Sequence, residues 1–243
     1  MILDAADFTF EPPKEVSFAR RVLIKPSAGY PRPHPVTTSR ETLAEVVRGI
    51  RRVSSADILI LERSLSSEPI HAIYKRLGYD FPRMILLDAD QCVPVAVENP
   101  LGRPFALTTF WMPNVILSCD FMISIAPCRI VEGKGEFSIK NLLGLLPSDR
   151  YMQEHRGFTE IPANADVDSV VADLYFTLPF DLGIIDARKK LVSSGDAYDG
   201  VIEDYGKVFV GTPYEVDLEA SQTIGAETEY LHLIDKARCE QGE

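Results

Sequence analysis

The feature that most constrains the fold is a recurring order along the chain, in which a short apolar run is followed by a segment with helical spacing. The first example is "RRVLIK" at residues 20–25, followed by a proline-rich loop and then a helical segment at residues 38–53. The apolar residues of that segment recur as on one face of a helix: Leu43, Val46, Val47 and Ile50. Thr38 and Glu41 have capping-box spacing, so we expect the helix to begin at Thr38.

The same order continues to the end of the chain. Further strands are predicted at residues 56–62, 83–89, 120–127, 181–187 and 206–212, and a hairpin at residues 92–98 and 104–110. Further helices are predicted at residues 67–79, 137–146, 167–178, 213–224 and 227–237. This alternation predicts an α/β fold with a mostly parallel or mixed central sheet and helices on both faces. We expect a single domain over residues 1–243, with two α/β halves meeting near residues 100–120 as the alternative.

Charge limits the classes of partner. The formal net charge is −11 and the pI is about 4.9, which disfavours nucleic acid and anionic membrane surfaces. The most apolar window, residues 104–119, contains Pro113 and Asn114 and is shorter than the ~20 residues that span a bilayer. The first residues carry acids and lack a basic segment followed by an apolar one, so no secretory signal is expected. These features together predict a cytoplasmic protein.

Cysteine spacing gives no sign of a metal centre. Cys92, Cys119, Cys128 and Cys239 form no C-x-x-C pair and match neither ferredoxin nor zinc-finger spacing. We therefore predict reduced thiols, no metal site and no iron–sulfur cluster motif in this chain. The loop around Lys134 also lacks the glycine spacing of nucleotide-binding loops. The sequence leaves the cofactor open.

Basic residues follow several of the predicted strands. In an open α/β sheet, ligands bind outside the carboxyl ends of the strands. Lys25 and Arg32 follow the first strand, and Arg129 and Lys134 follow the strand at 120–127. The next predicted helix, which Ser138 can cap, carries Lys140 and Asn141. We expect these six residues to bind a ligand: Lys25, Arg32, Arg129, Lys134, Lys140 and Asn141. The alternative for Lys134, which lies between two glycines, is a solvated residue in a surface turn.

Two residues are candidates for catalysis. His155 lies in a polar loop, where it can act as an acid or base or simply be solvated. Asp186 ends a predicted strand, where it can orient a base or cap the following turn. No serine, histidine and aspartate order and no catalytic cysteine signature is present, so the reaction class stays open.

Four segments resemble the domain-of-unknown-function family 362: residues 22–51, 121–147, 181–196 and 207–225. In that family, an I-K-P strand end precedes a T-T helix start, and an S-x-K-N-L-x-G helix, a V-D-G strand and an A-V-D helix follow. The matching positions here are Lys25, Pro26, Thr37, Thr38, Lys140, Asn141, Gly144, Asp186 and Asp217, with His155 similar to a histidine after the K-N-L helix. Residues 127–132 read P-C-R-I-V-E instead of P-K-x-K-T-H, and Ala187 replaces the glycine of V-D-G.

The resemblance strengthens the functional assignment of Lys25, Lys140 and Asn141. The family is also similar in outline to the N-terminal part of nickel-pincer lactate racemases, a likeness of fold that places no nickel cofactor here. Our leading hypothesis is an uncharacterised cytosolic α/β protein, an enzyme or a binding protein, whose basic cleft holds a small carboxylate or phosphate. The alternative is a non-enzymatic accessory module for a redox or iron–sulfur protein partner, because many relatives carry a ferredoxin-like module.

Overall fold

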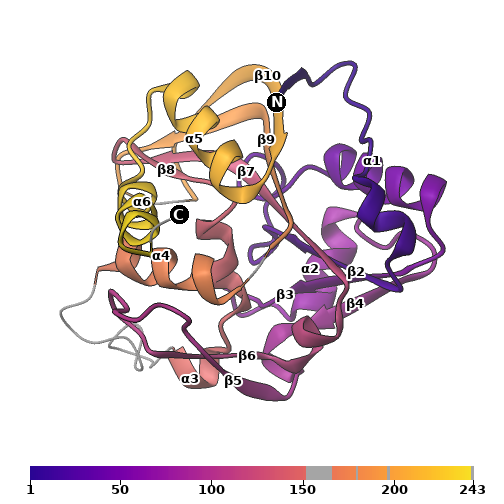
Figure 1. Ribbon diagram of the computed structural model, residues 1–243. Coiled ribbons are helices and arrows are strands. Elements are labelled where there is room, and N and C mark those ends of the chain that lie inside the picture. The colour runs from indigo at the N-terminus through magenta and orange to yellow at the C-terminus, as the bar shows by residue number, and fades with distance from the viewer. Residues whose placement is uncertain (152–165, 179, 196–197, 242–243) are drawn as a thin grey trace.

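The computed structural model describes residues 1–151, 166–178, 180–195 and 198–241, and it contains a mixed eight-stranded sheet (Figure 1). The strand order is β1-β10-β9-β7-β2-β3-β4, with β8 paired to β7. Five strands run parallel: β2 (Arg21–Pro26), β3 (Asp57–Glu62), β4 (Met84–Asp88), β7 (Phe121–Val131) and β9 (Leu182–Ser193). Three pair in antiparallel fashion: β1 (Ile2–Asp4), β8 (Lys134–Glu136) and β10 (Val201–Gly211). The predicted α/β fold with a mixed sheet is confirmed.

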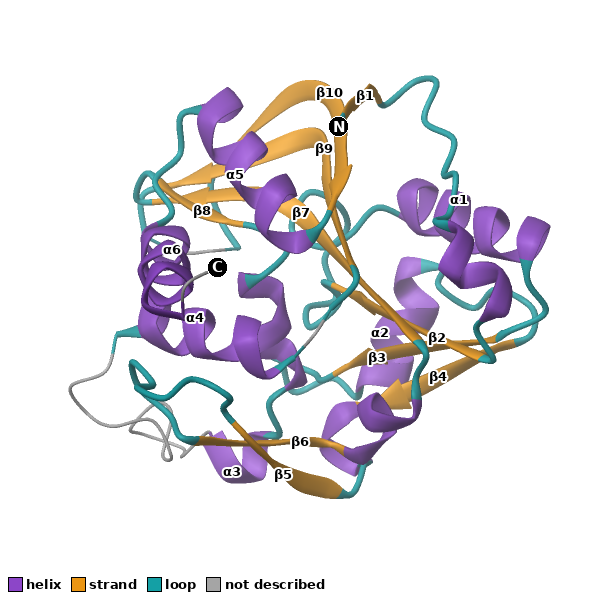
Figure 2. Ribbon diagram, viewed as in Figure 1, coloured by secondary structure: helices purple, strands orange, loops and turns teal. Residues whose placement is uncertain are grey.

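Helices and a small separate sheet surround this central sheet (Figure 2). The α-helices are α1 (Arg40–Val53), α2 (Ile70–Leu77), α3 (Ser148–Tyr151), α4 (Val167–Thr177), α5 (Pro213–Ile224) and α6 (Glu229–Gln241). The 3-10 helices are η1 (Lys14–Phe18), η2 (Ala89–Gln91), η3 (Asn114–Ser118) and η4 (Lys140–Leu145). The predicted hairpin is present as the two-stranded sheet of β5 (Pro94–Glu98) and β6 (Thr109–Pro113), but its second strand begins at residue 109 and not at residue 104.

Alternation along the buried strands divides the core into two layers. Val22 and Ile24 of β2 pack in the layer that includes residues of α1 and α2. Leu23 between them faces the other layer, which includes residues of β6, η4 and α4. Because side chains alternate along a strand, Lys25 lies on the same face as Leu23. The register thus places this lysine under η4 rather than under α1.

Two local predictions are wrong. Helix α1 is capped by Ser39, whose side chain accepts from Thr42 N at 3.1 Å, and not by Thr38. The Thr38 hydroxyl is already engaged, because it accepts from Ser27 N and donates to the carbonyl of Ile125. Ser138 does not cap the next helix, because its hydroxyl donates to Asp217, and η4 is a 3-10 helix.

The Gly-Lys-Gly loop is part of a hairpin between β7 and β8. Gly133 takes the left-handed conformation with φ 81°, which a turn requires and glycine adopts without strain. Strand β7 is longer than predicted and continues to Val131, pairing in parallel with β9 and in antiparallel fashion with β8, so the turn comes later in the chain than predicted. Within the described ranges, no helix is long and apolar enough to cross a membrane. The division into domains stays a prediction.

Candidate functional site

The carboxyl ends of β2 and β3 border a cavity of about 300 Å³. Its walls come from the loop after β2, the residues that follow β3, the β7–β8 hairpin, η4, and Tyr198 in the connection between β9 and β10. These segments are far apart in sequence and meet here because the parallel strands of a sheet end at the same edge. Four of the six predicted ligand-binding residues line this cavity: Lys25, Arg129, Lys140 and Asn141.

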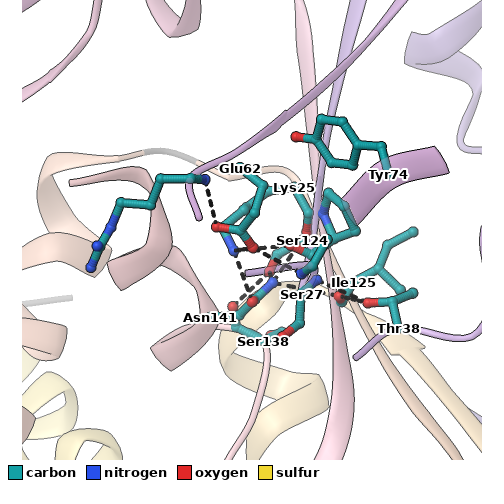
Figure 3. A network of polar contacts seen from close by, with 12 residues as sticks. Lys25, Ser27, Thr38, Glu62, Tyr74, Ser124, Ile125, Ser138 and Asn141 are labelled. Atoms are coloured by element: carbon teal, nitrogen blue, oxygen red, sulfur yellow. Dashed lines mark hydrogen bonds and ion pairs between the residues drawn. The ribbon is translucent and has the colours of Figure 1, made fainter. Parts of the chain in front are cut away.

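A buried ion pair lies at the cavity (Figure 3). The Lys25 ammonium donates to Glu62 Oε2 at 2.7 Å, to Asn141 Oδ1 at 2.9 Å and to the carbonyl of Pro26 at 2.9 Å. The Lys25 side chain is 1% exposed and that of Glu62 is 3% exposed. Burial lowers the pKa of Lys25, and the Glu62 carboxylate opposes that change. Three acceptors around three N–H bonds match the charged form of the amine.

Backbone groups and an amide hold the ion pair in place. The Glu62 carboxylate also accepts from Ala28 N at 3.0 Å and from Arg63 N at 3.1 Å. The Asn141 amide donates to the carbonyl of Lys25 and to the Ser124 hydroxyl, both at 3.1 Å. Asn141 therefore forms hydrogen bonds with both the backbone and the side chain of Lys25. This network of hydrogen bonds, with the ion pair at its centre, connects β2, β3, β7 and η4.

Gly144 lets η4 approach the ion pair closely. A Cβ atom on Gly144 would lie 2.4 Å from Glu62 Oε1 and 2.8 Å from Lys25 Nζ. Real Cβ atoms essentially never come so close to other heavy atoms, so only glycine fits this position without a shift. The K-N-L-x-G segment therefore has a structural explanation: its asparagine bonds to the lysine and its glycine makes room for the pair.

A second charged group lies on the β7–β8 hairpin and η4. Arg129 and Glu136 are cross-strand neighbours, and Arg129 Nε lies 3.2 Å from Glu136 Oε2. The Nε–H does not point at that oxygen, because the atom is buried without a hydrogen-bond partner in the described ranges. Lys140 Nζ lies 3.5 Å from the other oxygen of the same carboxylate. The Glu136 carboxylate thus forms ion pairs with both Arg129 and Lys140.

Arg63 is the charged residue of the cavity that the sequence analysis missed. It follows directly after β3, lines the cavity and is 4% exposed. Its Nε is buried without a hydrogen-bond partner, and its guanidinium forms no ion pair, among the described residues. A buried charge without a partner costs several kcal/mol, roughly, and native structures rarely keep one without a reason.

Two predicted ligand-binding residues lie outside the cavity lining. Arg32 Nη1 donates to the carbonyl of Tyr198 at 2.7 Å, so it fastens a segment that contributes to the wall. Lys134 is 53% exposed and lies 3.8 Å from Asp168. The hairpin turn directs this lysine toward α4, so the alternative of a surface position describes it better than a pocket wall.

The two catalytic candidates are not part of the cavity lining that the structure describes. His155 lies outside the described residues. Asp186 is fully buried, and its Oδ2 accepts from Ser39 N at 3.0 Å, at the start of α1. His34 Nδ1 lies 3.7 Å from the same oxygen. Asp186 lies within β9, because this strand continues to Ser193 and does not end at residue 187 as predicted. Its side chain holds the loop after β2 against β9, and its Oδ1 accepts from Arg188 N at 3.4 Å.

Asp217 matches the aspartate of the A-V-D element. It binds the residues that directly precede η4. Its carboxylate accepts from Ser138 N, Ser138 Oγ, Ile139 N and Tyr230 OH at 2.5–2.9 Å. Burial raises the pKa of Asp217 to about 6, and these hydrogen bonds oppose the rise. Ser138 in turn accepts from Ser124 through its carbonyl, so this group is continuous with the Lys25 network.

The same rule that found Lys25 would have found the missed pair Glu62 and Arg63. They end and follow an apolar strand, "DILIL", as Lys25 ends its own. Glu136 and Tyr198 left no such signal, since their positions depend on the hairpin and on the long connection after β9. Among the described residues, no group of three or more His, Cys, Asp or Glu is placed to hold a metal ion.

Comparisons with known proteins place this chain by fold and by family. A solved structure that resembles it is the lactate racemase apoprotein from Thermoanaerobacterium thermosaccharolyticum, with a TM-score of 0.53 and 13% sequence identity. The match covers 90% of this chain and 53% of that one, so the chain spans about half the length of the lactate racemase. At this identity the likeness concerns the fold alone. None of the curated proteins matches the sequence significantly.

The family comparison is more extensive. The family described as Domain of unknown function (DUF362) matches residues 22–221, a range that contains η4, β9, all but the first residue of β2 and most of α5. The match covers well over half of the chain and includes the Lys25 network and the cavity lining. This chain belongs to the DUF362 family.

Proposed function

We propose that this protein binds a small anion, a carboxylate or a phosphate, in the cavity at the carboxyl ends of β2 and β3. The observation that carries the proposal is Arg63: a guanidinium that is 4% exposed, lines the cavity and has no partner among the described residues. A guanidinium presents a planar fork of donors that matches a carboxylate or phosphate. Such an anion would supply the partner that the described residues do not provide.

The charge of the lining supports the same conclusion. Four cationic side chains line the cavity and two carboxylates accompany them, so the lining carries an excess of two positive charges in a chain with a net charge of −11. Glu62 forms an ion pair with Lys25, and Glu136 forms ion pairs with both Arg129 and Lys140. The excess therefore lies with Arg63 and with the Arg129–Lys140 pair.

The proposal is a binding function and assigns no reaction. The lactate racemase that shares the fold is named for lactate, which is itself a small carboxylate, and lactate is a natural member of a ligand panel. A role as an accessory to an iron–sulfur partner stays a prediction, because no contact among the described residues favours it.

Titration calorimetry and thermal unfolding with acetate, lactate and inorganic phosphate test this function. A bound anion stabilises the folded state by RT ln(1 + [L]/Kd), which is about 2.7 kcal/mol at a hundredfold excess over Kd. In the Arg63→Met variant we expect at least a tenfold loss of affinity. Arg103→Met is the matched control, since Arg103 is exposed and outside the cavity lining. Absence of binding by every anion, or equal binding by both variants, contradicts the proposal.

A further inference from the structure

Part of the cavity lining is apolar, which the binding of a bare inorganic anion does not explain. Tyr30, Leu65, Leu143 and Tyr198 all contribute to the lining, and they come from the loops after β2 and β3, from η4 and from the β9–β10 connection. A hydrated anion such as phosphate gains nothing from apolar walls, since contact with them removes water without replacing its hydrogen bonds. The cavity therefore offers contact area that a charged group alone cannot use.

The apolar and cationic walls adjoin each other at Tyr198. The ring centroids of Tyr30 and Tyr198 lie 3.7 Å apart, and the Arg129 guanidinium carbon lies 5.5 Å from the centroid of the Tyr198 ring. A molecule whose charged end lies against the Arg129 guanidinium thus has the Tyr198 ring beside it. The arrangement fits a ligand with one charged end and one apolar end.

Size and charge narrow the class of ligand further. A volume of about 300 Å³ is at the lower end of the range of small-molecule sites, which is roughly 300–1,000 Å³. Among the cationic side chains of the lining, Arg63 alone forms no ion pair with a described residue, so the cavity offers one unpaired cation to one anionic group. These two constraints favour a compact monoanion over a phosphate ester or a nucleotide.

We infer that the ligand of this cavity is a monocarboxylic acid with a short apolar body, either one aromatic ring or a chain of a few carbon atoms. The inference rests on the proposed anion-binding function and adds the chemistry of the rest of the ligand. Arg63 receives the carboxylate as a planar fork, while Leu65, Leu143 and the two tyrosines enclose the body. Binding of this kind combines a few polar contacts that orient the ligand with an apolar surface that supplies affinity.

The test is a series of ligands titrated into the full-length protein at constant pH and ionic strength. Acetate, butyrate and hexanoate keep the carboxylate and lengthen the body, while benzoate supplies a ring. We expect affinity to rise by about fourfold for each added methylene group that is buried, the equivalent of about 0.8 kcal/mol. Hexanol and benzyl alcohol keep the body without the charge and should bind at least tenfold more weakly than the matching acids.

A variant separates the two ends of the ligand. Leu65 lines the cavity and is partly exposed, so Leu65→Ala shortens the apolar wall without opening a fully buried core. We expect the loss of affinity in this variant to be at least fivefold greater for hexanoate than for acetate. Thermal unfolding of the free variant serves as the control for its fold.

The outcomes distinguish a failure of this inference from a failure of the proposed anion-binding function. Acetate or phosphate binding as tightly as hexanoate and benzoate overturns the inference and leaves anion binding in place. No binding by any of the anions overturns both. Alcohols binding as tightly as the matching acids supports an apolar site and overturns the role of Arg63. A steady rise along the acid series, reduced by Leu65→Ala, supports the inference.

Discussion

Replacing Lys25 with methionine tests whether the buried ion pair stabilises this fold as the structure implies. Methionine has a similar length and keeps the packing under η4, but it removes the cation. Glu62 would then be left charged at 3% side-chain exposure, with only the amides of Ala28 and Arg63 as donors. The acceptors Asn141 Oδ1 and the Pro26 carbonyl would also lose the proton donor that now lies 2.9 Å from each.

The expected cost follows from those losses. Breaking a buried pair by removing one partner costs roughly 3–5 kcal/mol of the free energy of unfolding, because the remaining charge is buried without compensation. The double variant Lys25→Met/Glu62→Gln removes both charges, and it should recover about 2 kcal/mol or more relative to the sum of the two single costs. Lys140→Met is the control, since Lys140 is 19% exposed and 3.5 Å from Glu136, and its loss should cost about 1 kcal/mol or less.

Urea unfolding provides the measurement. Trp111 is the single tryptophan and lies in β6, so its fluorescence follows the sheet that packs beside η4, and circular dichroism follows the helices. Linear extrapolation at constant slope gives the change in the free energy of unfolding for each variant. A cost below about 1 kcal/mol for Lys25→Met, or single costs that simply add in the double variant, would refute the reasoning.

Three further predictions follow from single contacts. Gly144→Ala should lower the free energy of unfolding by about 1–3 kcal/mol in thermal unfolding, because its Cβ meets the Lys25–Glu62 pair, while Gly102→Ala, with open space around it, should change little. Burial raises the pKa of Asp217 from 3.8 in the unfolded chain to about 6 in the folded protein, so its contribution to the free energy of unfolding is full below about pH 4 and is lost as pH rises to about 6. Urea unfolding between these pH values should show the free energy of unfolding fall by roughly 3 kcal/mol, and Asp217→Asn should lack this fall. Arg63→Met should raise the stability of the free protein while weakening anion binding, and a lower melting temperature in the free variant would contradict the unpaired guanidinium.

The sequence predicted the elements of this fold well because burial determines them. Apolar runs became strands, and the loops and helices follow in the predicted order, with α2 ending at Gly78 and α5 at Gly225, both left-handed. The cap of α1 moved by one residue because a tertiary partner, the carbonyl of Ile125 on β7, occupies the Thr38 hydroxyl. Local patterns do not contain such long-range competition.

The predicted site residues also differ in whether local sequence patterns could locate them. Lys25, Arg129, Lys140 and Asn141 line one cavity because Lys25 lies at the carboxyl end of β2, Arg129 lies on the part of β7 beyond the end of β2, and the other two lie on η4. Lys134 is directed elsewhere because β7 continues as a hairpin, an antiparallel extension that apolar spacing did not reveal. That the lining residues bind a ligand stays a prediction.

The two charged groups of the cavity differ in how far they are satisfied, and that difference assigns them different roles. Lys25 has three acceptors and Glu62 has three donors, so an anion gains little by approaching either and would have to displace existing bonds. Arg63 has no such bonds to lose. Consequently, affinity for a carboxylate should depend strongly on Arg63 and weakly on the ion pair, provided that the pair is replaced as a unit. A Lys25→Met/Glu62→Gln protein that folds and still binds benzoate, beside an Arg63→Met protein that folds and does not, is the combination that this division of roles requires.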